Sequence, residues 1–310
     1  MCIRDSGTGF LVLLGSDNRV ENLTVRGFFE GIKLGGRNNL VRNVEFDRLC
    51  DDAIGTLSGG AGNVFSDLVI RRGCDKCMQS FGDLADTDPD PRLDSHYNGI
   101  FRNIDFIGCA QPARMTDAGR YRIERSRLLP LPLATPWSAP DRLFECSGPR
   151  FSSGQPGELI VHIADSEMTG CRRGIRIGGQ ATAVLTRNRI SNAMLRGVLA
   201  TGESRVRLQS NVIVANGGEY SAEAGEGGVS ALDSAHVDLG GGAVTIDGET
   251  ISSRGHNVIC ANVDRSLTPR QLENRSTNPV SALHNYWCGR ETVPEGPGLS
   301  SVDPALPTPP

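Results

Sequence analysis

Two short phrases of the sequence place charged side chains in the same setting. "LCDDAIGT" carries adjacent carboxylates, Asp51 and Asp52, behind a cysteine, and "GCDKCMQS", farther along the chain, carries Asp75 and Lys76 in the same places. Carboxylates held close together raise each other's pKa, and a hard cation relieves that repulsion. Calcium is such a cation and takes several oxygen ligands at about 2.3 to 2.6 Å. The first phrase can therefore help to bind a cation, and the second can add an ammonium group beside it.

These phrases belong to a longer repeat. Seven segments share a polar Asn or Asp, alternating apolar residues, a small turn and a second short apolar run; they begin at Asn22, Asn43, Asp67, Asn103, Asp165, Asn188 and Asn211. The two longest intervals, after Asp67 and after Asn103, contain insertions, and "RYRIERSRLLP" (120–130) is a less regular copy inside the longer of them. The regular period, about 21 to 24 residues, is too short for a propeller blade, and the leucine signature of leucine-rich repeats is missing.

The repeat favours an all-β protein, a single-stranded right-handed parallel β-helix with about 22 to 24 residues per rung. Glycine is abundant, at 38 residues, and aromatic residues make up only 5%, which suits many short strands separated by turns. Asn and Gly are expected at the corners, where a positive φ is needed. Successive rungs then lie about 4.8 Å apart and enclose one continuous apolar core.

The domain boundaries follow from where the repeat holds. We expect residues 1–7 to be a non-native junction, residues 8–304 to form the β-helix domain, and residues 305–310 to be a proline-rich tail. Segments near 82–99 and 129–157 break the pattern and are predicted to be loop insertions on one side of the solenoid, where binding clefts tend to be built. Trp287 is expected to cap the core.

The cysteines also follow the repeat. In a β-helix Cys50, Cys74 and Cys109 stack in one column, with Cys171 at the equivalent place farther along. They can be a ladder of small buried thiols or form a disulfide between rungs. Cys74 and Cys77 make a single CxxC, and without a second pair they do not complete a zinc site.

Stacking brings the charged residues together. Glu30, Asp52, Lys76 and Gln111 are expected to share one column, with Asp51 and Asp75 in the neighbouring one. Glu30, Asp51 and Asp52 are thus the candidate metal ligands, and the predicted cofactor is Ca²⁺. The alternative is structural: Asp residues at corners often cap turns, and a lysine one rung from acids can form an ordinary surface ion pair.

Residues from about Leu11 to Pro304 resemble the pectin-lyase-like β-helix superfamily in their repeat. The segment from Asn43 to Met115 is similar in its motifs "CDDAI", "CDKCMQ" and "CAQPARM" to pectate lyases of the third polysaccharide lyase family. By this resemblance, Asp51 and Asp52 match the calcium-binding acid pair. Lys76 and Arg114 match an essential lysine and arginine. Gln111 departs from the pattern, since it stands where those enzymes have a second lysine.

The resemblance implies calcium-assisted β-elimination on an acidic polysaccharide such as pectate. In such a reaction the uronate carboxylate is neutralised, a base removes the proton at C5, and the oxygen at C4 leaves. Lys76 and Arg114 are the predicted catalytic residues, with Arg114 suited to clamping a carboxylate. Gln111, Asp75 and His96 are the predicted substrate-binding residues.

Two other functions remain open. The chain can be a non-catalytic cell-surface β-helix that binds glycans, in which Gln111 reflects lost chemistry. It can also be a polygalacturonase-like glycoside hydrolase, although the expected "NTD" and "GHG" motifs are missing, and so is the "DPHE" of alginate epimerases.

Charge and hydropathy limit the partners. A net charge of −4 and a pI near 5.8 give no basic field for nucleic acid, although Arg172, Arg173 and Arg196 can form a local basic strip for an anionic chain. No run of eighteen apolar residues is present, so no membrane span is expected. We predict an exported monomer, extracellular, periplasmic or on the cell surface, whose partner is an acidic polysaccharide.

Overall fold

The chain is built almost entirely of short β-strands. The computed structural model describes residues 9–57, 59–72, 75–80, 96–116, 118–129, 148–154, 159–218, 227–246, 249–264, 266–288 and 299–301. These residues form strands in three sheets and contain no α-helix. Within them, no helix is therefore long and apolar enough to cross a membrane.

One large sheet positions the candidate site. Among the described residues it has ten strands, in the spatial order β1 (Gly9–Leu13), β3 (Glu30–Leu34), β5 (Ile54–Thr56), β7 (Lys76–Ser80), β9 (Gln111–Met115), β12 (Arg150–Ser153), β15 (Arg173–Gly179), β18 (Arg196–Ala200), β21 (Gly227–Asp233) and β26 (Leu272–Ser276). We call it the ten-stranded sheet.

The second large sheet has sixteen strands within the same described ranges. They are β2 (Arg19–Arg26), β4 (Leu40–Asp47), β6 (Asn63–Arg71), β8 (Gly99–Ile107), β10 (Gly119–Glu124), β11 (Arg127–Leu129), β13 (Leu159–Ala164), β14 (Glu167–Thr169), β16 (Thr182–Thr186), β17 (Arg189–Ser191), β19 (Arg205–Gln209), β20 (Val212–Val214), β22 (His236–Gly240), β25 (Val258–Cys260), β27 (Val280–Ala282) and β28 (Leu299–Ser301). A separate antiparallel pair joins β23 (Ala243–Ile246) to β24 (Glu249–Ser252).

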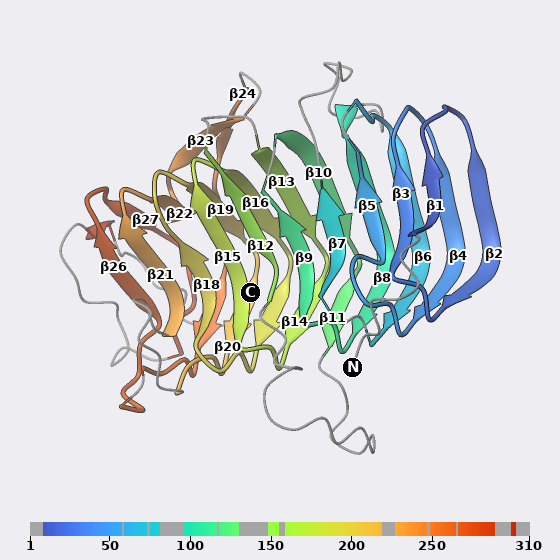
Figure 1. The fold of residues 1–310 in the computed structure, drawn as a ribbon. Helices are drawn as coiled ribbons and strands as arrows, with labels where there is room; N and C mark the ends of the chain where they lie inside the picture. The colour runs from blue at the N-terminus through green and yellow to red at the C-terminus, as the bar shows by residue number, and fades with distance from the viewer. Residues whose placement is uncertain are drawn as a thin grey trace.

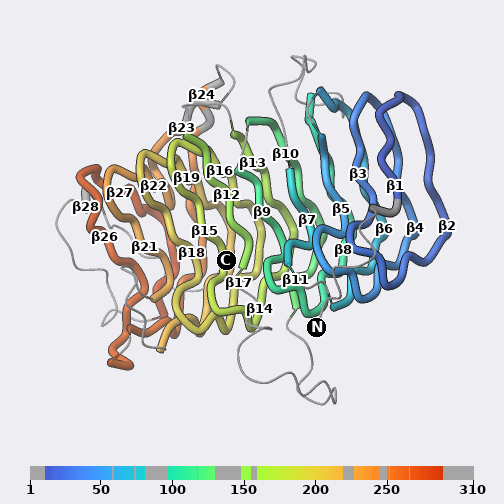
Figure 2. Tube along the Cα trace, viewed as in Figure 1, coloured from blue at the N-terminus to red at the C-terminus, as the bar shows by residue number. Residues whose placement is uncertain are grey.

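Each strand of the two large sheets pairs in parallel with the equivalent strand of the next repeat, so the chain advances coil by coil (Figures 1 and 2). The pairs Arg19↔Leu40 and Leu40↔Val64 reproduce the first two intervals of the repeat. The longest interval contains an additional copy, because β10 pairs with β8 on one side and with β13 on the other. The architecture is consistent with the β-helix solenoid that the repeat predicts.

Corresponding apolar side chains stack in the core. Ile32, Ile54, Met78 and Ala113 are paired in register from β3 to β9, and all are buried. On the other sheet the rings of Phe65 and Phe101 stack with centroids 5.2 Å apart. Because each coil shares its apolar contacts with the next, the core is continuous along the stack.

The predicted corners have the expected backbone conformation. Asn22, Asn43, Asp67, Asn103 and Asp165 all have φ between 52° and 59°. Farther along the chain the predicted alignment of the repeats is wrong by one residue. Glu167 pairs with Arg189, and the positive φ falls on Arg187 and Ser210 instead of on Asn188 and Asn211. These two residues precede the asparagines at 188 and 211.

Asn188 and Asn211 have a different role, in a buried ladder of asparagines. The backbone N–H of Asn188 donates to Oδ1 of Asn211 (2.9 Å), and that of Asn211 donates to Oδ1 of Asn257 (2.9 Å). Asn257 continues the ladder to Asn285. Each side chain thus satisfies backbone groups that a turn would otherwise bury without partners.

The cysteine and loop predictions need corrections. Of the two alternatives for the cysteines, the disulfide between rungs is the one present at Cys109, although its partner is Cys77 of β7 and not a member of the predicted column. Cys171 is also disulfide-bonded, and Cys260 and Cys288 form a further disulfide. Cys74 lies outside the described residues. The insertion predicted for 129–157 is interrupted by β12, which has enough apolar side chain in Phe151 to join the core.

Other boundary predictions concern residues that the structure does not describe. The junction 1–7, the tail 305–310 and most of the predicted insertion 82–99 lie outside the described ranges. Trp287 is buried and belongs to the core.

Candidate functional site

The candidate residues lie on neighbouring strands of the ten-stranded sheet. Ile32 pairs with Ile54, and Ile54 pairs with Met78. Two residues before these three positions stand Glu30, Asp52 and Lys76. Lys76 itself pairs with Gln111. The expected column of Glu30, Asp52, Lys76 and Gln111 is therefore present in the register.

Backbone hydrogen bonds hold the two aspartates against the preceding coil. The amide of Asp51 donates to the carbonyl of Phe29 (2.8 Å), and the amide of Gly31 donates to the carbonyl of Asp52 (2.8 Å). A Cβ at Gly31 would lie 2.0 Å from the carbonyl oxygen of Ala53, so only glycine permits this approach. Gly31 thereby helps to bring Glu30 beside Asp52.

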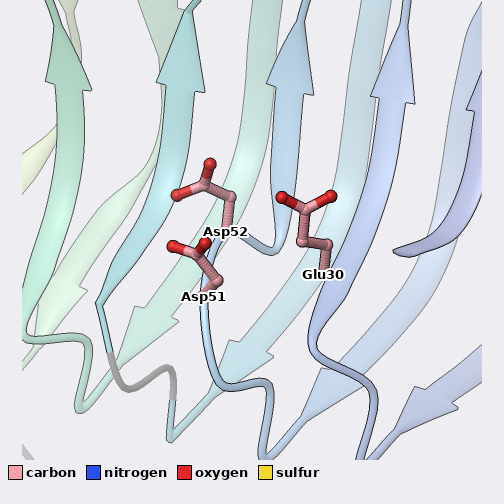
Figure 3. A group of neighbouring side chains, drawn as sticks. All are labelled: Glu30, Asp51 and Asp52. Atoms are coloured by element: carbon pink, nitrogen blue, oxygen red, sulfur yellow. The ribbon is translucent and has the colours of Figure 1, made fainter. Parts of the chain in front are cut away.

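Three carboxylates meet at this point (Figure 3). Glu30, at the start of β3, and Asp51 and Asp52, just before β5, each offer an oxygen atom within 4.8 Å of the others. Asp52 is the deepest, with a side chain 2% exposed, whereas the side chain of Asp51 is 26% exposed. We call these three residues the carboxylate cluster.

Two lysines flank the carboxylate cluster. Nζ of Lys33 lies 2.7 Å from Oε1 of Glu30 and 3.7 Å from Oδ2 of Asp52. Nζ of Lys76 lies 2.8 Å from Oδ2 of Asp75 and 3.5 and 3.6 Å from the Oδ1 atoms of Asp51 and Asp52. With Asp75 included, four carboxylates face two ammonium groups, a surplus of two negative charges (4 − 2) when all are ionised.

Burial and charge shift the protonation of this group. Burial and the neighbouring carboxylate of Asp51 raise the pKa of Asp52 to about 7, despite the opposing charges of the lysines. For Lys76, burial alone lowers the pKa, but the hydrogen bond to Asp75 and the charge of Asp52 outweigh it and raise the pKa. Both groups therefore favour their protonated forms.

The carboxylate cluster fits a hard cation. The Oδ1 atoms of Asp51 and Asp52 are buried and have no hydrogen-bond donor among the described residues; their contacts with Lys76 are ion pairs too long for good hydrogen bonds. A cation with a preference for oxygen would satisfy both atoms and neutralise the surplus charge. Glu30, Asp51 and Asp52 are the residues that would hold it.

The predicted arginine and glutamine lie on the next strand. Arg114 pairs with Gln79 across β9 and β7, and it stands three residues after Gln111. Its neighbours Ala113 and Met115 belong to the core, so Arg114 faces away from it. Lys76, Gln111 and Arg114 thus share the ten-stranded sheet with the carboxylate cluster.

Two other predicted residues do not fit an accessible site. His96 is 3% exposed and packs edge-on against Tyr97, whose ring also neighbours His162 and lies under Arg122 on the sixteen-stranded sheet. It lies three residues before β8 of that sheet, whereas the carboxylate cluster belongs to the ten-stranded sheet. Arg196 is 1% exposed, so it does not belong to an exposed basic strip.

Three charged residues of this sheet, Lys33, Arg150 and Arg176, were not predicted from the sequence. Lys33 follows Glu30 by three residues, a spacing that could have drawn attention to it once β3 was recognised. Arg150 pairs with Arg114 and with Arg176, but an insertion separates Arg150 from Arg114 in the chain. Their alignment becomes visible only when the strands are paired.

Comparisons with protein-family models, with curated proteins and with solved structures found no match for this chain.

Proposed function

We propose that the chain is a right-handed parallel β-helix that cleaves an acidic polysaccharide, such as pectate, by calcium-assisted β-elimination. The parallel pairing of successive coils supports the fold, and parallel crossovers are right-handed in about 98% of cases. The activity depends on one observation: Glu30, Asp51 and Asp52 converge within 4.8 Å, and Lys76 lies 3.5 and 3.6 Å from the two aspartates.

Calcium bound at the carboxylate cluster would neutralise a uronate carboxylate and so acidify the neighbouring C5 proton. Elimination then requires a base for that proton. The electrons of the C5–H bond form the C4=C5 double bond, and the C4–O bond breaks as the leaving oxygen takes a proton from water. Lys76 and Arg114 are the residues that we assign to this step.

The two cations suit different parts of the step. The pKa of Lys76 is raised, so the carboxylates must be neutralised before Lys76 can accept a proton. Arg114 has the planar guanidinium that binds a carboxylate through two parallel hydrogen bonds. We therefore assign the proton transfer to Lys76 and the positioning of the uronate to Arg114.

Glycan binding without catalysis is a second candidate, favoured by one observation. Gln111 faces Lys76 in register, where a second positive charge would have lowered the pKa of Lys76. With the neutral Gln111 there, Lys76 keeps its proton and can bind an anionic sugar without acting as a base. We also propose an exported monomer, supported by the disulfides Cys77–Cys109 and Cys260–Cys288, which persist in oxidising compartments.

Incubation with polygalacturonate and calcium tests the activity by the absorbance of the unsaturated product. We expect the absorbance to rise at the same rate with the parent protein and with the control Glu45→Gln, which replaces an acid on the other sheet. With Lys76→Met the rate of this rise should be about 100-fold or more lower. Absence of the chromophore with several polyuronates would favour binding alone. New reducing ends without the chromophore would instead indicate a hydrolase.

A further inference from the structure

Three arginines are aligned on the ten-stranded sheet. Arg114 of β9 pairs with Arg150 of β12, and Arg150 pairs with Arg176 of β15. We call them the arginine row. Core residues lie on both sides of Arg114 and Arg176 along their strands, and Phe151 of the core follows Arg150, so the three side chains leave the opposite face. Neighbouring strands place them at intervals of about 4.8 Å.

Within the described part of the chain, no acid compensates the arginine row. No carboxylate there forms an ion pair with any of the three, and the buried Nε atoms of Arg114 and Arg150 have no hydrogen-bond acceptor among the described residues. On the sixteen-stranded sheet, by contrast, Arg127 donates to Asp105 (2.7 Å) and Arg187 to Asp165 (2.6 Å). Uncompensated guanidinium groups in register repel one another.

The repulsion has a consequence for protonation. Burial, followed by the charges of Arg176 and Arg114, lowers the pKa of Arg150. Functional sites are the places where proteins commonly retain such local conflicts. An anion that accepts hydrogen bonds from the three guanidinium groups would remove the repulsion.

The position of the row indicates which anion. The carboxylate cluster lies at the start of β3 and just before β5, Lys76 lies on β7, and the arginine row continues the same sheet over β9, β12 and β15. Gln79 of β7 pairs with Arg114, and its buried Oε1 atom has no hydrogen-bond donor among the described residues. Gln79 thus adds a polar side chain between the carboxylate cluster and the arginine row. One arginine per strand matches a polymer with one acidic group per unit, because the strand spacing is close to the length of a pyranose.

We propose that Arg114, Arg150 and Arg176 bind the carboxylates of consecutive uronate residues, so that the acidic chain lies along the stack of coils. This inference rests on the proposed function for the identity of the polymer, and it adds that the chain must be acidic at consecutive sugars. Each guanidinium binds a carboxylate by charge-assisted hydrogen bonds, which are shorter and stronger than those between neutral groups.

Calorimetric titration with oligogalacturonates in the presence of EDTA tests the row separately from catalysis. EDTA removes the calcium on which the proposed elimination depends. We expect the double variant Arg150→Gln/Arg176→Gln to bind a hexasaccharide about 10-fold or more weakly than the parent, since about 1.4 kcal/mol corresponds to a factor of 10. The disaccharide should show a much smaller difference. The matched control, Arg189→Gln on β17, should bind like the parent.

The proposal is overturned if the double variant binds the hexasaccharide as tightly as the parent does. It is also overturned if Arg189→Gln weakens hexasaccharide binding as much as the double variant does. A sulfated oligosaccharide of the same length should bind more weakly; equal, row-dependent binding would overturn the assignment to carboxylates. Binding that depends on the row while no elimination occurs would refute the enzyme and retain the row. Elimination that is insensitive to the double variant would do the opposite.

The melting temperature separates this role from a structural one. Arg150→Gln removes a charge that its neighbours repel, so the variant should melt at the same temperature as the parent or higher. A clear fall in the melting temperature, together with weaker binding, would show that Arg150 supports the fold and would overturn the proposal.

Discussion

Nζ of Lys76 lies 3.6 Å from Oδ1 of Asp52, yet burial keeps the pKa of Asp52 at about 7. The neighbouring coil brings the ammonium group close, but it does not offset the loss of hydration and the charge of Asp51. The carboxylate cluster therefore changes its charge near neutral pH, where a change in one proton alters both stability and affinity for a cation.

The first prediction concerns the stability of the metal-free protein. The pKa of Asp52 is raised from 3.8 to about 7, so between these values the folded state holds a proton that the unfolded state releases. Stability should fall as pH rises from about 4 to 7. Asp52→Asn should melt at a higher temperature than the parent near pH 8, by about 2 to 4 °C per kcal/mol gained. Melting curves in EDTA across this range measure both proteins, and equal pH dependence in the two would refute the assignment.

The second prediction is that calcium stabilises the folded protein. A cation that binds only the folded state at 100 times its dissociation constant contributes about 2.7 kcal/mol. We expect calcium to raise the melting temperature near pH 8, and to do so less near pH 5, because the proton on Asp52 competes with it. Asp51→Asn should lose most of the increase, whereas Glu45→Gln should keep it. An equal increase in both variants would show that calcium binds elsewhere.

The register of the site could be predicted because the sequence marks it. Two phrases with the same cysteine and charge pattern, in successive repeats, align Asp52 with Lys76 without knowledge of the strands. The alignment failed at Asn188, where the interval between corners is one residue shorter than the interval between strands of the ten-stranded sheet. A count of residues between similar motifs does not reveal where within a coil the extra residue lies.

The arginine row and the pairing of Cys77 with Cys109 could not be read from the sequence for a related reason. Arg114 and Arg150 are separated by an insertion, so no regular period links them. Cys77 lies outside the predicted cysteine column, and its side chain reaches Cys109 diagonally, since the register of β7 and β9 does not pair these two residues. Such diagonal contacts depend on side-chain direction, which a repeat pattern does not contain.

The third prediction concerns the neutral residue beside Lys76. Gln111→Lys would place a positive charge in register with Lys76 and lower its pKa toward neutrality. If Lys76 removes the C5 proton, elimination should become several-fold faster and its pH–rate profile should shift to lower pH. Gln180→Lys, which adds the same charge beside Glu203, serves as the control. An unchanged profile in Gln111→Lys would argue against Lys76 as the base.

The fourth prediction concerns the disulfide between Cys77 and Cys109, which are 32 residues apart. The bridge ties β7 to β9 and restricts the unfolded chain, so its loss should lower the free energy of unfolding by about 2 to 4 kcal/mol. Denaturant unfolding of Cys77→Ser/Cys109→Ser measures this difference. Each single serine variant should be destabilised to a similar extent, since either removes the same bridge; a neutral double variant would contradict the prediction.

The last prediction concerns the buried asparagine ladder. Asn211 donates through Nδ2 to the carbonyl of Leu185 (2.8 Å) and to Oδ1 of Asn257 (3.0 Å), and its own Oδ1 accepts from Asn188. Asn211→Ala leaves several buried groups without partners, each at a cost of about 1 to 3 kcal/mol, so we expect a loss of about 3 to 5 kcal/mol.

Asn211→Asp separates the ladder from simple side-chain packing. Aspartate has the same shape, but when ionised it cannot donate to Leu185 or Asn257, and burial of its charge raises its pKa. The folded state then prefers the protonated form, so this variant should gain more stability than the parent as pH falls toward about 4, while Asn211→Ala should keep the pH dependence of the parent. Denaturant unfolding of both variants at several pH values measures the difference. Equal pH dependence would mean that the side-chain donors of the ladder contribute little to the stability of the coils.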